Sequence, residues 1–353
     1  MSTTTVDTLL SCFVMITLIL SAMIGISAFV NPFLQERQSW QKTVINQEFA
    51  EYLLLHAGSP TNWGSDADAS LTSFGLAEQS VATPFELDID KVTRLNEDNA
   101  YNVSFWDVFT AFGAQDKPFR IKIEPVFNVT LNLTSQVDEG DQTVYYFDVY
   151  TKKSNFPIAA SLSCYTVLGD YVVENSSSTP SSGVGSLKVT LPDSLNGTAL
   201  LIVIAKIEPR TMSYATYSFK HNSAVDPYPQ GTFVKLSPLN FTLKAELLYP
   251  DETSLSAKVF TYNYRFNLTK TSSETSIEYY DIPRLLDPSP MIIVMTRLNQ
   301  STSFAEWVAY PQIPLDFGSD FMGEHDLADS YSFSFLVTIN SAVYECEVTL
   351  GGT

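Results

Sequence analysis

The order of apolar and polar positions divides the chain into an apolar N-terminal part and a longer part of short alternating segments. From Leu9 to Val30 there is no charged residue and no proline. As a helix this run is about 33 Å long, which matches a hydrocarbon core of about 30 Å. A cleaved secretory signal is the alternative, but such signals carry basic residues ahead of the apolar run, and no Lys or Arg precedes Leu9. We therefore predict a retained membrane helix.

The helical pattern continues beyond the apolar run. Asn31-Pro32 predicts a kink, because proline lacks the backbone N–H and clashes with the preceding turn. Gly58 and Pro60 after His56 are typical of a helix end. We expect one helix from about Val6 to Leu55, roughly 75 Å long. Its second part is predicted to be amphipathic, with an apolar face made of Trp40, Val44, Phe49, Tyr52 and Leu53.

Residues 58 to 118 are polar and irregular, and predict a connector with one short helix from Phe105 to Phe112. From Phe119 the apolar period changes to two, as expected of strands with one buried face. The stretch Asn175 to Ser182 is rich in serine and is predicted to be a loop. The predicted strands are Phe119–Ile123, Val126–Leu133, Val144–Tyr150, Ala159–Leu168, Asp170–Val173, Ser186–Leu191, Ala199–Ile207, Tyr214–Phe219, Phe241–Leu248, Ala257–Phe266, Met291–Arg297, Glu306–Tyr310, Tyr331–Ile339 and Ala342–Leu350.

Short strands at this spacing are typical of β-sandwiches. The predicted fold is mainly β with one long N-terminal α-helix, followed by two β-sandwich units of the immunoglobulin-like kind. A proline-containing linker, Asp226 to Pro229, separates the two units. We expect four parts: an N-terminal transmembrane or assembly helix (1–57), the connector (58–118), a first β-sandwich (119–222) and a second (223–353).

The amino-acid composition limits the classes of fold and partner that the chain can have. Hydrophobic residues make up 45% of the chain and charged residues 17%, which is ample for packed cores. The formal net charge of −19 repels nucleic acid, so we expect no nucleic-acid partner. The three cysteines are too few for a disulfide framework. A pairing of Cys164 with Cys346 is left open, and buried free thiols are the favoured interpretation.

Catalytic chemistry has little support. His56, His221 and His325 lie far apart, and no zinc-protease, nucleophile-elbow, P-loop or dinucleotide-binding motif occurs. The acidic segment from Asp320 to Asp329 fits either a surface loop or a site for a hard cation, and the loop is the favoured interpretation. We expect no enzyme activity, no metal site and no cofactor.

Eight Asn-x-Ser/Thr sequons occur, more than chance gives for this composition, and none precedes residue 102. The excess indicates an exported surface that carries N-linked glycans, with everything after the helix outside the cell. The sequons are Asn102, Asn128, Asn132, Asn175, Asn196, Asn240, Asn267 and Asn299.

Several segments in combination resemble archaeal pilin-like surface proteins of the type IV filament superfamily. Ser2 to Leu10 followed by the apolar helix is similar to the start of such subunits. The connector and strand segments that carry the rest of the resemblance are Gly58–Gly64, Ser73–Ala77, Leu87–Val92 with Arg94-Leu95, Phe119–Ile123, and Glu306–Pro311 with Phe317-Gly318. Precursors in that superfamily carry a short basic leader, and no such segment stands before Val6.

The resemblance implies that the apolar helices pack together in a filament core or hold the subunit in the membrane. An acidic side chain near the start pairs with the amine of a neighbouring subunit in that superfamily, and Asp7 is the candidate. Its alternative role is that of a residue favourable to the helix dipole. The implied partners are membrane lipid and copies of this chain or other pilin-like subunits. The other implied assembly residues are Leu9, Leu10, Phe13, Ile16, Leu20 and Ile24.

We therefore expect a structural cell-surface subunit, anchored or assembled through its N-terminal helix. The alternative is a single-pass, membrane-anchored adhesin or binding protein that does not polymerise.

Overall fold

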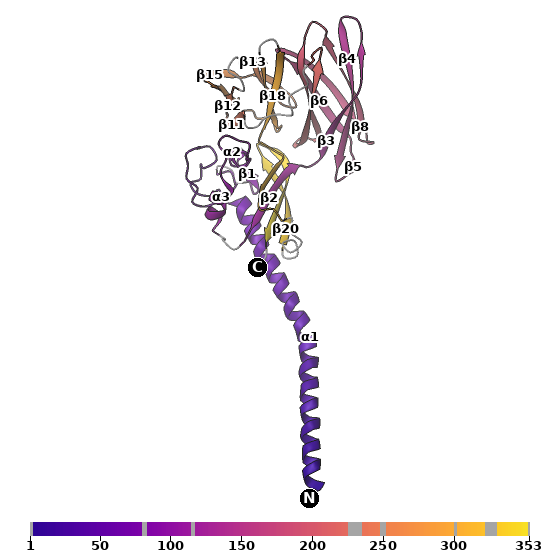
Figure 1. Ribbon diagram of the computed structural model, residues 1–353, viewed down its shortest axis with the longest axis vertical. Helices are drawn as coiled ribbons and strands as arrows, with labels where there is room; N and C mark the ends of the chain where they lie inside the picture. Colours follow the sequence, from indigo (N-terminus) through magenta and orange to yellow (C-terminus); the bar gives the residue numbers. More distant parts are fainter. Residues whose placement is uncertain are drawn as a thin grey trace.

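The computed structural model describes residues 3–79, 83–113, 117–224, 235–247, 252–299, 302–321 and 330–351. A long helical stalk projects from a head built of β-sheets, and the N-terminus lies at the far end of the stalk (Figure 1). The predicted fold class is confirmed: the chain is mainly β, with one long N-terminal helix and two β-sandwich units.

The stalk is helix α1, which spans Thr3–Leu55. The helix is unbroken through Asn31 and Pro32, and its axis changes direction about midway along its length (Figure 1). It ends close to the predicted position. Gly58 follows with a φ of 73°, a left-handed conformation that glycine adopts without the steric cost of a Cβ atom.

The head is joined to the stalk through a five-stranded basal sheet. Alternate side chains of its strand β2 (Phe119–Pro125), namely Phe119, Ile121 and Ile123, are fully buried against the end of α1 and its neighbours, as the period of two requires. In spatial order the basal strands are β1 Glu86–Leu87, β20 Ser330–Ile339, β21 Ala342–Gly351, β2 Phe119–Pro125 and β19 Leu315–Gly318.

Two short helices lie in the connector. The predicted helix α3 is confirmed at Phe105–Phe112; Ser104 caps its start and Gly113 ends it with a φ of 74°. Helix α2, Ile89–Arg94, was not predicted from the sequence. The Asp88 side chain caps its first turn. With six residues, α2 is too short to show a helical period.

The first β-sandwich packs two sheets around the side chains of Phe147, Val149, Leu187 and Val203, among others. One sheet contains β3 Asn128–Asp138, β4 Gln142–Lys153, β5 Phe156–Pro157 and β8 Val184–Pro192. The other has the order β10 Thr211–His221, β9 Gly197–Glu208, β6 Ala160–Leu168 and β7 Tyr171–Thr179.

The second β-sandwich also has two sheets, and its core is continuous with that of the basal sheet. One sheet has the order β11 Leu236–Leu239, β12 Thr242–Glu246, β16 Ile277–Asp281 and β15 Thr269–Ser273. The other has the order β14 Arg265–Asn267, β13 Glu252–Phe260, β17 Met291–Asn299 and β18 Thr302–Tyr310.

The two sandwiches pack face to face. Ile202 and Ile204 of β9 meet Ile292 and Val294 of β17 in a third apolar cluster. The other faces of both strands point into their own sandwich cores, so β9 and β17 are buried on both sides. This arrangement explains why their sequences read as unbroken apolar runs rather than alternating ones.

Two strand-level expectations were wrong. β2, β20 and β21 were expected within the two sandwiches, but they pair with one another in the basal sheet, because alternation reveals the buried face and not the partner strand. The Ser-rich loop expected over Asn175–Ser182 is a strand as far as Thr179, paired along its length with β6. The division of the chain into sandwich domains at residue 223 stays a prediction.

Candidate membrane and assembly helix

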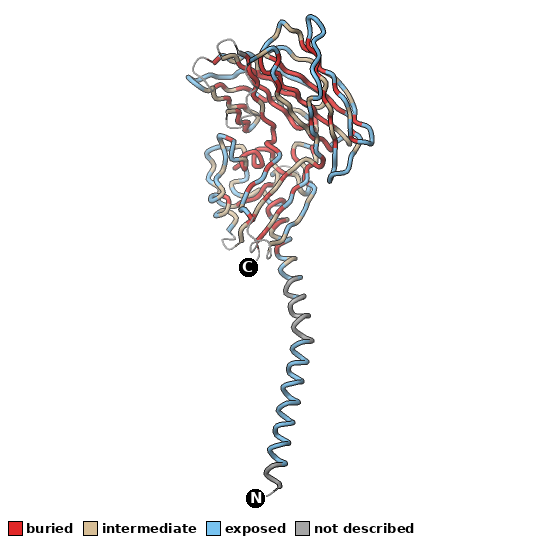
Figure 2. Tube along the Cα trace, turned by 45° about the vertical axis from the view of Figure 1, so that its right-hand side comes forward, coloured by how far each residue is buried: buried red, intermediate tan, exposed pale blue. Residues whose placement is uncertain are grey.

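The first half of α1 is an apolar rod that the rest of the described chain does not cover. Asp7–Ala28 has a mean hydropathy of 2.5 over 22 residues, and none of it is buried (Figure 2). Each large aliphatic side chain left in water forgoes about 1.5–3 kcal/mol, so the segment is compatible with a membrane anchor or a signal sequence. The six predicted apolar assembly residues are all 53–71% exposed: Leu9, Leu10, Phe13, Ile16, Leu20 and Ile24.

Two hydroxyl groups of this span bond to the helix backbone. The Thr17 hydroxyl lies 3.0 Å from the carbonyl oxygen of Phe13 and 2.9 Å from that of Val14. The Ser21 hydroxyl donates to the Leu18 carbonyl at 2.9 Å. A helix also pairs its own backbone groups, so these hydroxyls and the backbone can enter lipid with their donors bonded.

Asp7 is exposed and lies in the second turn, because α1 begins at Thr3. The helix dipole acts mainly on charges within the first turn, so the geometry gives little support to the dipole interpretation. Pairing of Asp7 with an amine of a neighbouring copy stays a prediction.

The last turns of α1 dock on the head. Ala50, Leu53 and Leu54 are fully buried in the core shared with the basal sheet. The buried Asn46 accepts a hydrogen bond of 2.6 Å from the ammonium of Lys117, which fixes the helix to the start of β2. The predicted amphipathic face begins later than expected, since Trp40 is 67% exposed.

Buried cations bind the connector to this junction. Lys91 is fully buried and donates to the carbonyl oxygens of Ala57 at 2.9 Å and Ala77 at 2.7 Å. Burial lowers the pKa of Lys91, while the nearby carboxylate of Asp88 opposes that shift. Arg94 donates to the carbonyl oxygens of Tyr101 and Asp66 at 2.8 and 2.7 Å. These side chains replace the backbone pairing that an irregular segment lacks.

A buried carboxylate extends the same junction to the second sandwich. Asp90 Oδ1 accepts from the Tyr310 hydroxyl at 2.6 Å and from the Asn240 backbone N–H at 2.8 Å. Burial raises the pKa of Asp90 despite these donors. Burial also raises the pKa of Asp88 to about 6. The charged pattern Asp88-Ile-Asp-Lys in an otherwise apolar segment was the only sequence signal for this cluster.

The connector and strand segments singled out in the sequence meet at this junction, whereas the start of α1 lies at the far end of the stalk. Trp63 from the first connector motif is buried and donates to the Gly75 carbonyl of the second at 3.1 Å. Gly64 packs so closely on Lys91 that a Cβ atom would lie 2.7 Å from its backbone nitrogen. Tyr310 links the C-terminal motif to α2 through Asp90. Their shared role in this fold is therefore to hold the head on the stalk.

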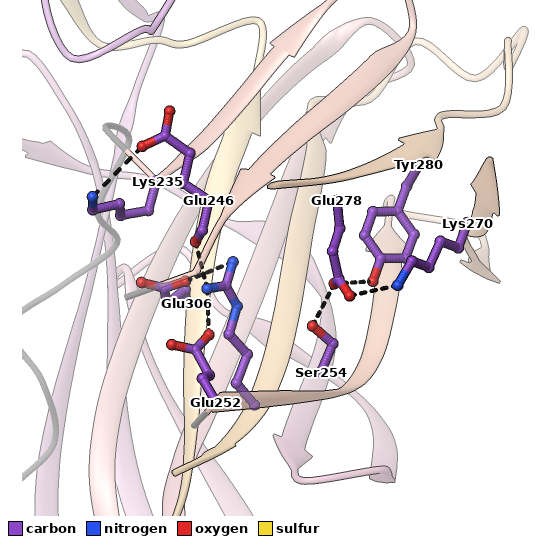
Figure 3. A network of polar contacts seen from close by, with 9 residues as sticks. Lys235, Glu246, Glu252, Ser254, Lys270, Glu278, Tyr280 and Glu306 are labelled. Atoms are coloured by element: carbon purple, nitrogen blue, oxygen red, sulfur yellow. Dashed lines mark hydrogen bonds and ion pairs between the residues drawn. The ribbon is translucent and has the colours of Figure 1, made fainter. Parts of the chain in front are cut away.

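A second buried ionic cluster lies within the second sandwich (Figure 3). The guanidinium of Arg297, fully buried, pairs with the carboxylates of Glu252 and Glu306, the latter at 3.3 Å. Close by, Glu278 accepts from Lys270 at 2.5 Å and from the Tyr280 hydroxyl at 2.7 Å. Burial raises the pKa of Glu278, but the hydrogen bonds outweigh it and the pKa lies below its ordinary value. Each of these buried carboxylates is therefore paired with a cation of the same sandwich, as expected of a structural cluster.

All eight sequon asparagines lie in the head and none is buried. Asn175 and Asn299 are half-buried, and the side-chain amide of Asn175 donates to the Lys188 carbonyl at 3.2 Å. Glycan attachment at the eight positions stays a prediction. The exposed ones are Asn102, Asn128, Asn132, Asn196, Asn240 and Asn267.

The cysteines are free thiols, so the pairing left open for Cys164 and Cys346 does not occur. Both are buried, in β6 and β21, and burial raises the pKa of each to about 12. Cys12 is exposed on the apolar span. Cys12 is therefore the accessible thiol of the chain.

The two histidines that the structure describes, His56 and His221, do not form a site. His221 is buried and bonded to the Tyr145 hydroxyl at 2.8 Å, and His56 stacks on Tyr52. Within the described ranges no group of three His, Cys, Asp or Glu side chains could hold a metal ion. Most of the acidic segment considered as a cation site, 322–329 with His325, lies outside the described residues.

No family model matches this chain, and no curated protein matches it. Among solved structures, a marsupial T cell receptor aligns at 8% identity over 52% of this chain and 96% of its own, with a TM-score of 0.19. A fragment of the I-band of titin aligns at 7% identity over 64% of this chain and 89% of its own, with a TM-score of 0.16. At such TM-scores neither alignment carries an argument about this chain.

Proposed function

We propose that this protein is a structural subunit of the cell surface, pilin-like, which is held in the membrane or assembled into an extracellular filament through α1. The observation that carries the proposal is the uncovered Asp7–Ala28 span, whose apolar surface needs lipid or other helices. Lipid and further copies of the chain are the proposed partners. The head has no catalytic part in this proposal.

Two features of the head support it. The buried end of α1 and the Asn46–Lys117 hydrogen bond join stalk and head firmly, so a load on the head reaches the helix. The sequon asparagines are all accessible and all on the head, as expected for a glycosylated surface outside the cell.

Cross-linking through Cys12 tests the proposal. Because Cys164 and Cys346 are buried, an oxidant or a short bis-maleimide applied to native membranes or filaments acts at Cys12. In a Cys12→Ser background, single cysteines at the exposed positions Leu10, Phe13 and Leu18 scan other directions around the helix. We expect linked species of two and more copies at some of these positions. Ser194→Cys, on an exposed turn of the head, is the matched control.

The outcomes separate the candidate functions. Linked copies at span positions, absent for Ser194→Cys, support assembly through α1. A chain that stays in the membrane fraction without linkage at any span position is the anchored adhesin instead. Recovery of the full-length chain in the soluble fraction as a monomer contradicts both.

A further inference from the structure

A cleft of about 300 Å³ opens where the basal sheet meets both sandwiches. We call it the junction cleft. It lies at the crossing from β2 into β3, opposite β10 and the middle of β18, and its lining includes Glu124, Asn128, Ser213, Tyr214, Thr216 and Trp307. The cleft thus touches four of the sheets that make up the head.

The cleft combines an aromatic wall with a few polar groups. The rings of Trp307 and Tyr214 meet edge to face with their centroids 6.0 Å apart. The Tyr214 hydroxyl donates to the Ile313 carbonyl at 2.5 Å, which fixes the wall in place. On the opposite side the Glu124 carboxylate is held by Lys122 at 2.9 Å. A pyranose ring suits such a site, since its C–H face packs on an aromatic ring while its hydroxyls reach polar groups.

One glycosylation sequon of the chain lies at this cleft. Asn128 lines the cleft, is exposed, and stands in the sequon Asn128-Val129-Thr130. A glycan attached to its side-chain nitrogen begins at the rim of the cleft. Tethering of this kind gives an effective concentration in the millimolar range, so even a weak sugar site is occupied.

We propose that the first sugars of an N-linked glycan on Asn128 seat in the junction cleft and brace the first sandwich against the basal sheet and the second sandwich. This inference rests on the proposed outward location, because N-glycosylation requires export. It gives one sequon a stabilising role that the others lack.

Asn132 provides the matched comparison. It lies four residues further along the same strand, is equally exposed, and forms the similar sequon Asn132-Leu133-Thr134, but it is not part of the cleft lining. A glycan there extends into solvent. Loss of the Asn132 glycan therefore measures the general effect of a surface sugar on β3.

The test uses the full-length protein from its native cells as wild type, Asn128→Gln, Thr130→Ala and Asn132→Gln. Glycopeptide mass spectrometry gives the occupancy of each sequon, and thermal unfolding with limited proteolysis gives the stability of the head. We expect Asn128→Gln and Thr130→Ala each to lower Tm by about 2–4 °C and to speed cleavage between the sandwiches. Asn132→Gln is expected to leave both near wild type.

A second host separates the sugar from the side chain. In cells that do not N-glycosylate, wild type and Asn128→Gln are expected to unfold at the same temperature. Equal effects of Asn128→Gln and Asn132→Gln in the native host overturn the inference, as does an unoccupied Asn128 beside occupied sequons elsewhere. Absence of glycan at every sequon overturns the inference and also removes the sequon support for the proposed location.

Discussion

At the scale of single residues, the head depends on buried charged groups that are held by hydrogen bonds or ion pairs. Lys91, Asp90 and Arg297 are all buried. Lys91 donates to backbone carbonyls, Asp90 accepts from the Tyr310 hydroxyl, and Arg297 pairs with the Glu306 carboxylate. Removing one member of such a group leaves the others desolvated and unpaired, which costs more than the pair itself contributes. These residues are therefore the sensitive points of the fold.

Replacing Arg297 tests this sensitivity. Arg297→Met leaves the carboxylates of Glu252 and Glu306 buried without their cation. We expect the head to lose about 3–5 kcal/mol of stability in chemical denaturation at neutral pH. Arg120→Met is the control, because the Arg120–Asp316 pair is largely solvent-accessible and is expected to contribute about 0–1 kcal/mol. Equal losses for the two variants would contradict the role assigned to the buried cluster.

Asp88 gives a prediction about pH. Its folded-state pKa of about 6 lies above the ordinary value of 3.8, so the folded protein binds this proton more tightly than the unfolded chain. The contribution of Asp88 therefore opposes folding increasingly as pH rises from about 4 to about 6. Asp88→Asn removes that contribution but keeps an oxygen to accept from the Asp90 and Lys91 backbone N–H groups.

We expect the stability of Asp88→Asn relative to wild type to rise across pH 4 to 6, by up to about 3 kcal/mol, and to stay constant above. Asp88→Ala loses the helix cap as well, so its curve has the same slope but lies about 1 kcal/mol lower. Urea unfolding at several pH values measures both. A difference between Asp88→Asn and wild type that does not change with pH refutes the raised pKa.

At the scale of elements, the sequence predicted the helices and strands with a strong local period and missed those without one. The apolar run and the following amphipathic part predicted α1 to within a few residues, and α3 was predicted at its observed bounds. β7 was missed beyond Val173 because its polar and serine residues show no alternation of apolar and polar positions. One of these serines, Ser177, donates to the Ser186 carbonyl of the neighbouring strand at 3.2 Å, a contact that the sequence does not reveal. The single strand predicted over Ala257–Phe266 was wrong: β13 ends at Phe260, and β14, Arg265–Asn267, turns back to pair with it. With three residues, β14 is too short to display alternation.

The element boundaries lead to a truncation prediction. A chain that begins at residue 31 lacks the apolar span but keeps Ala50, Leu53 and Leu54 in the core. We expect it to be soluble, folded and rich in β-structure by circular dichroism. A chain that begins at residue 59 also lacks these three side chains, and two buried leucines alone are expected to cost about 2–5 kcal/mol each. Equal stability of the two truncations contradicts the docking of α1.

At the scale of the whole molecule, an apolar helical span that the rest of the described chain does not cover carries a head whose hydrophobic cores are buried. The apolar character and length of the span could be read from the sequence, because they depend on local composition alone. The face-to-face packing of the two sandwiches and the pairing of β2 with β21 could not, because both depend on partners more than 80 residues apart in the chain. The proposed assembly role of Leu9 to Ile24, which their exposure supports, is the central claim.

The measurement that tests this claim most directly is cryo-electron microscopy of material sheared from cells that express the native protein. The account predicts filaments that contain this chain, with α1 helices packed together inside and β-heads outside. A sheared fraction without this chain, while single copies of it stay in the cell membrane, contradicts assembly and leaves the anchored adhesin.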